Sequence, residues 1–368
     1  MARISRRQFN LGLAATGIAT VGLTGCGISD AYGAATQQTW RHTEAGDLSP
    51  AQKRREIVRY GTLAANSHNT QPWTFAIEED RIEIRPDFTR ATPAVDPDDH
   101  HLFVSLGCAA ENMVAAAPAF GMEAVPEVTP RDGETRVAVA LGSGPTRRSP
   151  EFEAIPRRQC TRSEYDGTPL TASELRQLQA AAETPGVDAI ILNAAQPISE
   201  VAEFVATGSD AQVRDPEFVA ELKEWIRFSS AEALEKRDGL FSGCMGNPTI
   251  PPWLGRIVFD FVFTENAERE KNIKHVNSSS AVVVFTAKQN DRAHWVEVGR
   301  AYQRFALVAT HLGLKHAFVN QPVEVPEVRE QFASYLGIGD RRPDLVIRVG
   351  RAPEMPRSLR RSLDDVIV

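Results

Sequence analysis

The chain has 368 residues, of which 42% are hydrophobic and 24% charged, and its formal net charge is −7. Such a composition is typical of a globular protein, and the negative net charge gives no reason to expect a nucleic-acid partner. Four cysteines without a C-x-x-C pair argue against a disulfide framework or a zinc ribbon, and the length allows one large or two smaller domains.

Residues 1–26 have the features of a targeting signal. Ser5-Arg6-Arg7-Gln8-Phe9 leads into an uncharged run, 9–25, and resembles the twin-arginine export signal. Leu23-Thr24-Gly25-Cys26 resembles a lipobox, whose cysteine receives a diacylglyceryl group. A membrane-spanning anchor is the alternative, but the run is short and interrupted by glycines. The sequence therefore predicts a bacterial cell-envelope protein, exported by the twin-arginine machinery, lipid-anchored at Cys26, with a polar tether over 27–49.

The segment Asn66-Ser67-His68-Asn69-Thr70-Gln71-Pro72-Trp73 gathers amide and hydroxyl side chains in a short turn. Amides carry both donors and acceptors and can hydrogen-bond the edge of a flat heteroaromatic ring. Pro72 favours extended backbone at Gln71, which would hold the amides in place before a predicted strand, 73–77. An ordinary turn between a helix and a strand is the alternative.

An acidic segment follows, with Asp96, Asp98 and Asp99 directly before His100 and His101. These residue types can ligate a metal ion. Acids at the start of a helix are common, however, and Asp98 and Asp99 stand where an N-cap and first turn favour them. The sequence therefore predicts a charged helix start and no metal site.

The chain contains a faint internal repeat of an apolar helix, a glycine stop and two strands. The first copy has its helix at 101–120 and its last strand at 135–142, whereas the second has its helix at 293–311, strands at 315–319 and 344–350, and an inserted helix at 325–336. The breaker-rich segment 142–145 separates them. We therefore expect an α+β fold with two lobes, 50–145 and 150–361, that pack around their central apolar helices.

The turn at 67–73 resembles the S-x-N-x-Q-P-W loop of the FMN-dependent nitroreductase family, in which that loop lies against the flavin. The resemblance extends over about 49–361, is nearest to the Acg-like branch with two fused lobes, and implies a nitroreductase-like fold. It assigns flavin contacts to Ser67, Asn69 and Gln71. Family members are typically homodimers with a flavin at the interface.

The phosphate-binding R-x-S-x-R/K segment of that family has its match in the second half only, at Arg158, Cys160 and Arg162. The first half has the amide loop and lacks the arginine segment, and the second half has the reverse. This pattern predicts a dimer fused into one chain with one FMN. Cys160 stands in place of the usual serine, and a thiol is a weak donor, so Thr161 or backbone N–H groups would have to replace it.

Weaker matches add further candidates for cofactor binding. By the resemblance, Asn272 would meet the pyrimidine edge of the flavin and His275 stands where lysine is usual. Asn320 and Gln321 follow a strand where the family presents its backbone to the flavin, and the C-terminal Arg360 and Arg361 resemble a basic contact to the phosphate. Each of these matches alone is as compatible with surface chemistry as with cofactor chemistry.

Residues 229–253 are rich in Gly, Pro and Ser and predict an irregular lid. The resemblance implies an exported FMN oxidoreductase that passes electrons to a small nitro-aromatic or quinone-like acceptor. Nicotinamide nucleotides are cytoplasmic, so an exported enzyme would need another donor, such as a membrane quinol. Two alternatives are a protein that holds flavin without turnover and an envelope interaction module that has lost the flavin.

Overall fold

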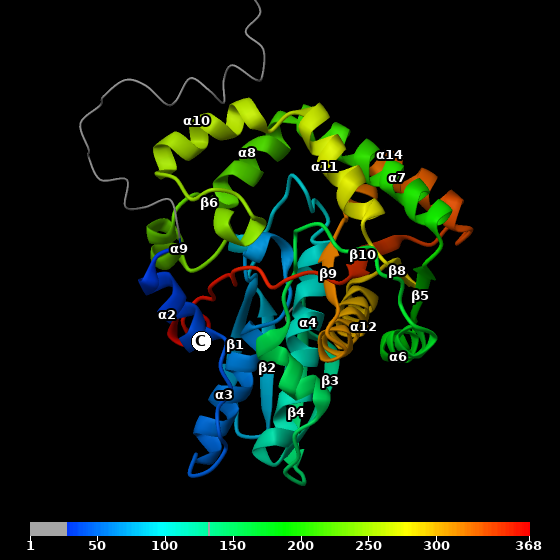
Figure 1. The fold of residues 1–368 in the computed structure, drawn as a ribbon. Helices are drawn as coiled ribbons and strands as arrows, with labels where there is room; N and C mark the ends of the chain where they lie inside the picture. Colours follow the sequence, from blue (N-terminus) through cyan, green and yellow to red (C-terminus); the bar gives the residue numbers. More distant parts are fainter. Residues whose placement is uncertain (1–27, 132) are drawn as a thin grey trace, which may run out of the picture.

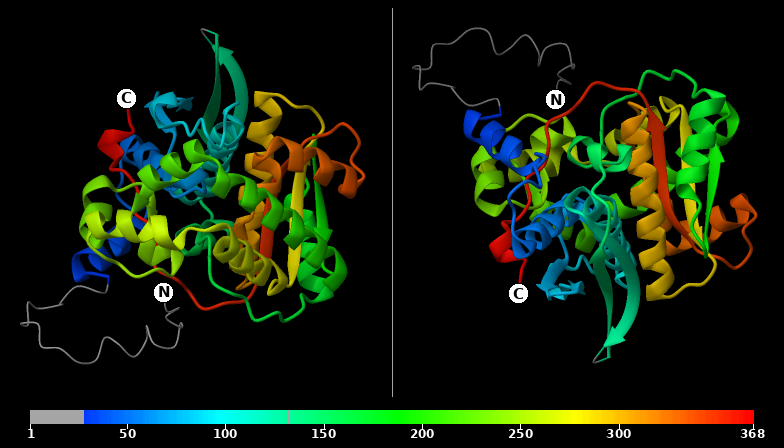
Figure 2. Two further views of the ribbon diagram at one scale, coloured as in Figure 1. Left: turned by 90° about the horizontal axis from the view of Figure 1, so that it is seen from above. Right: turned by 90° about the horizontal axis from the view of Figure 1, so that it is seen from below.

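The protein consists of two α+β lobes that lie side by side (Figures 1 and 2). The computed structural model describes residues 28–131 and 133–368, so the predicted export signal and Cys26 lie outside the described residues. Each lobe contains a four-stranded antiparallel sheet. The predicted fold class, α+β with two lobes, is confirmed.

The first lobe is built on the sheet β1-β2-β4-β3. Its elements are α3 (Pro50–Thr62), β1 (Trp73–Ile77), β2 (Arg81–Pro86), α4 (His100–Ala116), β3 (Met122–Arg131) and β4 (Glu134–Ser143), with short 3₁₀ turns at Ser67–Asn69, Phe88–Arg90 and Ala117–Phe120. Val137 and Val139 on β4 are fully buried while their neighbours are partly exposed. This alternation shows that the sheet is covered by helix on one face only.

The second lobe is built on the sheet β5-β8-β10-β9. Its main elements are α5 (Pro150–Ala154), α6 (Ala172–Ala182), β5 (Val187–Leu192), β8 (Ala281–Ala287), α12 (Arg292–His311), β9 (Lys315–Phe318), α13 (Gln321–Glu324), α14 (Pro326–Leu336) and β10 (Pro343–Gly350), with a 3₁₀ turn at Ile155–Arg157. Every residue of β8 is buried: Val283 and Phe285 face one hydrophobic core, and Val282 and Val284 face another. Helices therefore cover both faces of this sheet.

The two sheets repeat one strand order. In each, the first strand of the lobe stands at one edge, and the strand that directly follows the central helix stands at the other. The predicted inserted helix is α14, and it accounts for the greater length of the second copy. The repeat that the sequence suggests is therefore a repeat of topology.

Helices α4 and α12 make the most extensive helix contact in the molecule, as expected for central apolar helices. They cross at two glycines. A Cβ at Gly107 would lie 2.0 Å from the carbonyl oxygen of Val296, and a Cβ at Gly299 would lie 2.0 Å from that of Val104. These contacts are reciprocal, as at a two-fold interface. Among the described residues only the helical stretch 100–120 is long and apolar enough to cross a membrane, and it is mostly buried here.

The C-terminal tail, 351–368, leaves the second lobe and runs across to the first (Figure 2, red). It ends beside β1: the backbone N–H of Phe75 donates to the carbonyl of Val366 (2.7 Å), and that of Val368 donates to the carbonyl of Phe75 (2.9 Å). A short turn, Leu363–Asp365, precedes this pairing. The tail therefore adds an edge to the other lobe's sheet and ties the two lobes together.

A long insertion between β5 and β8 forms the top of the molecule in Figure 1. It contains α7 (Ala195–Arg214), α8 (Pro216–Trp225), β6 (Ile226–Arg227), α9 (Ser230–Lys236), β7 (Leu240–Phe241), a 3₁₀ turn at Ser242–Met245, α10 (Pro252–Val262) and α11 (Glu265–Asn277). The prediction that 229–253 is irregular is wrong. Ser229 accepts a hydrogen bond from the backbone N–H of Glu232 and so caps α9, and the glycines and prolines only separate short elements.

The predicted polar tether, 27–49, is also wrong for part of its length. Helix α2 (Asp30–Thr39) lies against the insertion, where Tyr32 is 1% exposed and its ring is 4.5 Å from that of Phe241. The Tyr32 hydroxyl donates to the carbonyl of Arg357 at 2.8 Å. Two large aromatic residues in a polar segment, Tyr32 and Trp40, were the signal of a docked element.

Candidate functional site

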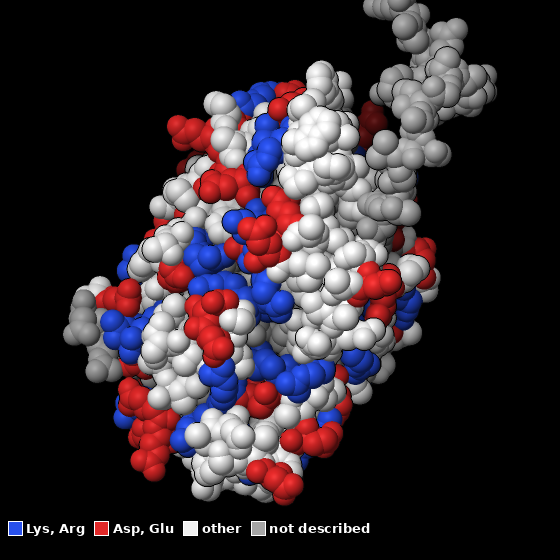
Figure 3. All heavy atoms as spheres, turned by 90° about the vertical axis from the view of Figure 1, so that its left-hand side faces the viewer, with Lys and Arg blue, Asp and Glu red and all other residues white. Residues whose placement is uncertain are grey.

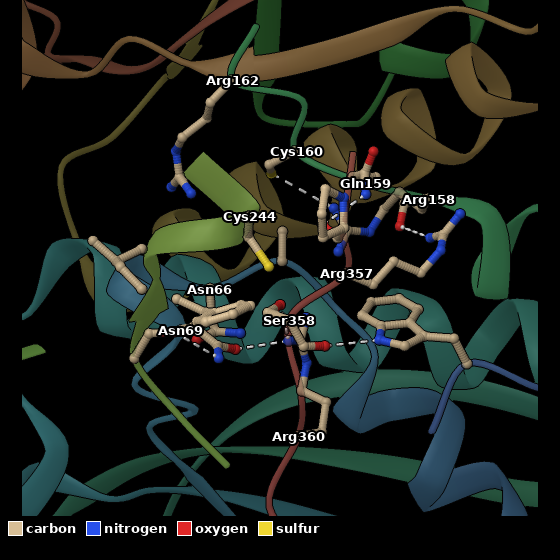
Figure 4. Close-up of a pocket in the computed structure, with 16 residues that line it drawn as sticks. Asn66, Asn69, Arg158, Gln159, Cys160, Arg162, Cys244, Arg357, Ser358 and Arg360 are labelled. Atoms are coloured by element: carbon tan, nitrogen blue, oxygen red, sulfur yellow. Dashed lines mark hydrogen bonds between the residues drawn. The ribbon is translucent and has the colours of Figure 1, made fainter. Parts of the chain in front are cut away.

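One cavity lies where the two lobes, the insertion and the C-terminal tail meet (Figure 4). It contains about 560 Å³ of space, part of it open to solvent. Its lining residues come from five segments: Trp40, the first-lobe loop (65, 66 and 69), the second-lobe segment 158–162, the insertion (239–241 and 244) and the tail (356–358 and 360). Segments far apart in the sequence therefore form one site.

Four arginines line this cavity, namely Arg158, Arg162, Arg357 and Arg360, and no carboxylate does. Arg360 is almost fully buried, and that burial, together with repulsion from Arg158, lowers its pKa to about 9. Burial also lowers the pKa of Arg357, although Glu354 opposes the shift. Positive charge collected in this way is costly to bury without an anion. The cavity is therefore suited to an anionic ligand.

Arg158 and Arg360 are held by backbone carbonyls of the first lobe. Arg360 donates to Thr62 (2.7 Å) and to Ala64 (3.1 Å), and Arg158 donates to Leu63 (3.2 Å). The Nε of Arg158 is buried and has no partner. These contacts fix both guanidinium groups at the cavity, and the Nε of Arg158 keeps donor capacity for a ligand.

Arg162 differs from the other three arginines. Among the described residues it makes no ion pair or hydrogen bond to protein atoms, although its charge, after burial, contributes to lowering the pKa of His68. In Figure 4 its side chain and that of Arg360 approach the cavity from opposite sides. Arg162 is thus the arginine most available to a ligand.

The amides of the first-lobe loop bind protein backbone. Asn69 donates to the carbonyls of Gly239 (3.0 Å) and Leu359 (3.3 Å) and accepts from Arg360 (2.7 Å). Gln71 donates to the carbonyl of Arg237 (2.9 Å) and accepts from the backbone N–H of Arg361 (2.8 Å). Asn69 lines the cavity, whereas Gln71 lies beneath it, fully buried. The loop therefore holds the insertion and the tail through the hydrogen bonds of Asn69 and Gln71, a set of contacts that we call the clasp.

The expected extended backbone at Gln71 is wrong. His68, Asn69 and Gln71 have φ values of 47°, 55° and 55°, which lie in the left-handed region. Three non-glycine residues in that region carry strain of about 1–3 kcal/mol each. The side-chain and backbone contacts of the clasp outweigh the preference that Pro72 imposes on the residue before it.

The clasp gives a testable expectation for stability. Gln71→Ala should leave the carbonyl of Arg237 and the N–H of Arg361 without partners and cost about 1–3 kcal/mol per buried group. The loss should appear as faster hydrogen exchange in 237–241 and 359–361. Gln196→Ala is a matched control, because Gln196 is exposed and bonds only Glu200. Equal exchange in both variants would contradict the clasp.

Cys160, at the position of the family's serine, lies beside β9, where its backbone pairs with His316. Its thiol is 3.7 Å from a guanidinium nitrogen of Arg158, and the Thr161 hydroxyl donates to Gln159 instead. A second thiol, Cys244, also lines the cavity, and burial raises its pKa to about 11.

Besides Gln71, six predicted residues do not line the cavity. Ser67 contacts His68, Arg361 donates to the carbonyl of Asp365, and Asn272 donates to Ser209. The side chain of Asn320 accepts from the backbone N–H of Val346. The side-chain amide oxygen of Gln321 is buried and has no partner among the described residues. The carbonyl of His275 accepts from Arg348, which also holds the carbonyl of Thr161, and burial lowers the pKa of His275 to about 4. Their roles in cofactor binding stay predictions.

Sequence reasoning missed three lining residues that are not polar candidates, Trp40, Phe241 and Cys244. Trp40 donates its indole N–H to the carbonyl of Ser358 (2.8 Å) and lies under the guanidinium of Arg360. A single tryptophan in a polar segment was the only signal for it. Phe241 and Cys244 fall within the predicted lid, 229–253, and the Gly, Pro and Ser content of that segment was the signal for the insertion.

No family model matches the chain. Two curated relatives from Mycobacterium tuberculosis match most of it, and both are named, provisionally, as NAD(P)H nitroreductases. Rv3131 is 26% identical over 330 residues, which cover 85% of this chain and 90% of the relative. Acg is 25% identical over 327 residues, covering 85% and 94%. The chain is therefore similar, over most of its length, to two proteins that carry this name. The match extends across both lobes, and the predicted resemblance to the family and to its Acg-like branch is confirmed.

Solved nitroreductases are more distant. The FMN-dependent nitroreductase NfnB of Mycobacterium smegmatis, in complex with NADPH, is 14% identical with a TM-score of 0.39, covering 59% of this chain and 96% of its own. A nitroreductase with bound FMN from Desulfitobacterium hafniense is 12% identical with a TM-score of 0.38, covering 60% and 98%.

Proposed function

We propose that this protein is an exported, FMN-dependent oxidoreductase of the nitroreductase type that holds one FMN in the cavity between its lobes. The observation that carries the proposal is the set of four arginines, free of carboxylates, at the cavity that both lobes and the tail build. The names of the relatives and the loop at 67–73 support the redox activity.

The residues present fit FMN in their chemistry. A phosphate dianion needs several charge-assisted donors, and Arg158, Arg162 and Arg360 offer guanidinium groups around one space. The unpartnered Nε of Arg158 is the kind of donor that such a ligand satisfies. Trp40 and Phe241 offer apolar surface to a flat ring, and Asn66 offers an amide at the same wall.

Bound flavin would supply the electron transfer, and the chain would bind it, orient it and exclude water. The arginines would fix the phosphate end, and α2 and β7 would cover the cavity. This cover is held by hydrogen bonds from Tyr32 to the carbonyl of Arg357 and from Trp40 to that of Ser358. The acceptor we propose is a small nitro-aromatic or quinone-like molecule.

The same cover favours a second function, in which the protein holds flavin without turnover. The insertion that forms part of this cover is also held by the hydrogen bond from Asn69 to Gly239, so an acceptor would have access only through the part of the cavity that is open to solvent. The two functions differ in one experiment. If the protein is an oxidoreductase, a soluble quinone should reoxidise the dithionite-reduced protein fast enough to sustain turnover. If the protein sequesters flavin, reoxidation should be slow.

The test of the proposal is the absorption spectrum of the protein as isolated, followed by quantification of FMN released on denaturation. We expect a flavin spectrum and about one FMN per chain, because one arginine segment and one amide loop are present. A ratio near two would contradict the fused-dimer interpretation. Colourless protein that fails to bind added FMN would support an interaction module instead.

We also propose that the protein works at a membrane surface, with a membrane quinol as electron donor. Helix α10 exposes a stripe of large apolar residues, in which Trp253 is 67% and Phe261 78% exposed and Ile257 lies between them. An uncharged area is visible at the upper right of Figure 3, where α10 lies. Such a helix is suited to the interface of a lipid bilayer.

The place where the chain enters the fold supports this orientation. Ser29 donates its backbone N–H to Ser230 on α9, and Ile28 lies beside Gly243. Both contacts are on the insertion that carries α10. A lipid anchor at Cys26 would therefore hold α10 close to the membrane.

Export and anchoring have separate tests. Replacing Arg6 and Arg7 with lysine should leave precursor in the cytoplasm, because the twin-arginine receptor does not accept charge alone. Cys26→Ala should abolish incorporation of labelled lipid. One acyl chain gives only marginal membrane affinity, so stable anchoring needs the further acylation of bacterial lipoproteins. Mature wild-type protein without lipid at Cys26 would contradict the anchor.

A further inference from the structure

A second cluster of chemically active side chains lies at the start of α4, outside the cavity. Asp96, His100 and His101 are 4%, 0% and 5% exposed, and their potential ligand atoms all lie within 4.8 Å of one another. Asp344 on β10 and Glu324 on α13, both from the second lobe, contact the two histidines. The cluster therefore spans the lobe interface.

The histidines are unusual because their ring nitrogens lack partners. Within the described part of the chain, His101 has no hydrogen bond at either ring nitrogen and His100 has none at Nδ1, although all three atoms are buried. A buried polar atom without a partner costs about 1–3 kcal/mol, and native proteins contain few of them. Three in one cluster indicate a ligand that accepts nitrogen lone pairs.

His100 has the arrangement that a metal-bound histidine shows. Its Nε2 is 2.8 Å from Asp344 Oδ1, while the other oxygen of Asp344 accepts from the backbone N–H of Ala287. A carboxylate that accepts from one ring nitrogen leaves the lone pair of the other free for a metal and fixes the ring. Here the free atom is Nδ1, which is the one without a partner.

His101 lies between two carboxylates. Its Nδ1 is 3.9 Å from Asp96 Oδ1 and 3.9 Å from Glu324 Oε1. The other oxygen of Glu324 accepts from Gln212 (2.6 Å), which orients the carboxylate. Ligands about 2.0–2.2 Å from a tetrahedral ion are separated by about 3.4 Å. The ligand atoms of Asp96, His100 and His101 lie within 4.8 Å of one another, so the side chains would have to draw closer together around the ion.

A helix cap accounts for part of the cluster only. The carboxylate of Asp96 accepts the backbone N–H groups of His101 and Leu102, each at 3.0 Å, and so caps α4. Asp99 is the N-cap residue, as the sequence predicts, but its side chain makes no cap hydrogen bond, and Asp98 pairs with Arg342. Capping explains Asp96 but not the free imidazole nitrogens.

We propose that His100 Nδ1, His101 and Asp96 bind a divalent transition-metal ion of the zinc class, with Glu324 as fourth ligand and Asp344 orienting His100. Two imidazoles and carboxylate oxygens suit Zn²⁺ and its neighbours, and disfavour Mg²⁺ and Ca²⁺, which take oxygen ligands. Imidazole ligates a metal in its neutral form, so the affinity should fall as the pH is lowered. The ion would join the first lobe to the second.

The test uses purified full-length protein that has been stripped with a chelator. Zn²⁺ alone should remain bound after gel filtration at about one ion per chain by elemental analysis, and Co²⁺ alone should give the visible absorption of a tetrahedral nitrogen and oxygen site. His101→Gln should lose at least tenfold in affinity. Asp344→Asn, which contacts His100 and supplies no ligand to the ion, should lose about 10–100-fold.

His294→Gln is the matched control, because His294 pairs with Asp291 at the exposed start of α12 and should leave metal binding unchanged. Adding Zn²⁺ should raise the Tm of wild type and of this control and not of His101→Gln. Should His101→Gln fail to fold, the Co²⁺ spectrum of wild type against Asp344→Asn decides. The proposal is overturned if stripped wild-type protein retains no ion, or if His101→Gln and Asp344→Asn bind metal as wild type does.

Discussion

Gly107→Ala should destabilise the protein by about 3 kcal/mol or more, because the added methyl group would occupy the space of another helix. Its Cβ would lie 2.0 Å from the carbonyl oxygen of Val296 and 3.1 Å from the backbone nitrogen of Arg300. Overpacking a well-packed core usually costs 1–3 kcal/mol, and here the obstacle is backbone that cannot rotate away. Urea unfolding followed by circular dichroism measures the change.

The crossing of α4 and α12 offers a second variant of the same kind, and α2 offers a control. Gly299→Ala should cost a similar amount, since its Cβ would meet the carbonyl of Val104 at the same 2.0 Å. Gly33→Ala, in α2, places the methyl group in open space and should gain up to about 1 kcal/mol in helix propensity. If both core variants unfold at the wild-type urea concentration, α4 and α12 do not pack as described.

The packing of α4 against α12 could be predicted from the sequence, because it depends on the local periodicity of apolar residues. The apolar faces of 100–116 and 292–311 recur at helical spacing, and glycine stops follow both. Two such helices must bury their faces, and each is the other's nearest partner. The strand order follows from the same repeat, so the two-lobe fold is predictable from the sequence.

The insertion and the site were less predictable, for a physical reason. Gly239 and Phe241 reach the cavity because β7 pairs with β6 and because Asn69 holds Gly239, and both contacts join residues distant in the sequence. The family resemblance assigned flavin contacts to Asn69 and Gln71, and these contacts stay predictions. It could not indicate that their amides would be engaged by the backbone of the insertion and the tail.

Arg162→Ala should lower FMN affinity about tenfold to a hundredfold while leaving the stability of the flavin-free protein within about 0.5 kcal/mol. A charge-assisted contact is worth about 1.5–3 kcal/mol, which corresponds to that range of affinity. Arg162 bonds no protein atom among the described residues, so little in the fold should depend on it. Titration of stripped protein with FMN, followed by flavin fluorescence, measures the affinity, and urea unfolding measures the stability.

Two further arginines separate binding of the phosphate from support of the fold. Arg158→Ala should lower both affinity and stability, because Arg158 also holds the carbonyl of Leu63. Arg157→Ala is the control: it belongs to the same basic run but lies outside the cavity, so affinity should stay at the wild-type value. If Arg162→Ala and Arg158→Ala both keep wild-type affinity for FMN, these two arginines do not bind the phosphate. Arg357 and Arg360, on the tail side of the cavity, would then be its remaining partners, because they are the other cations that line it.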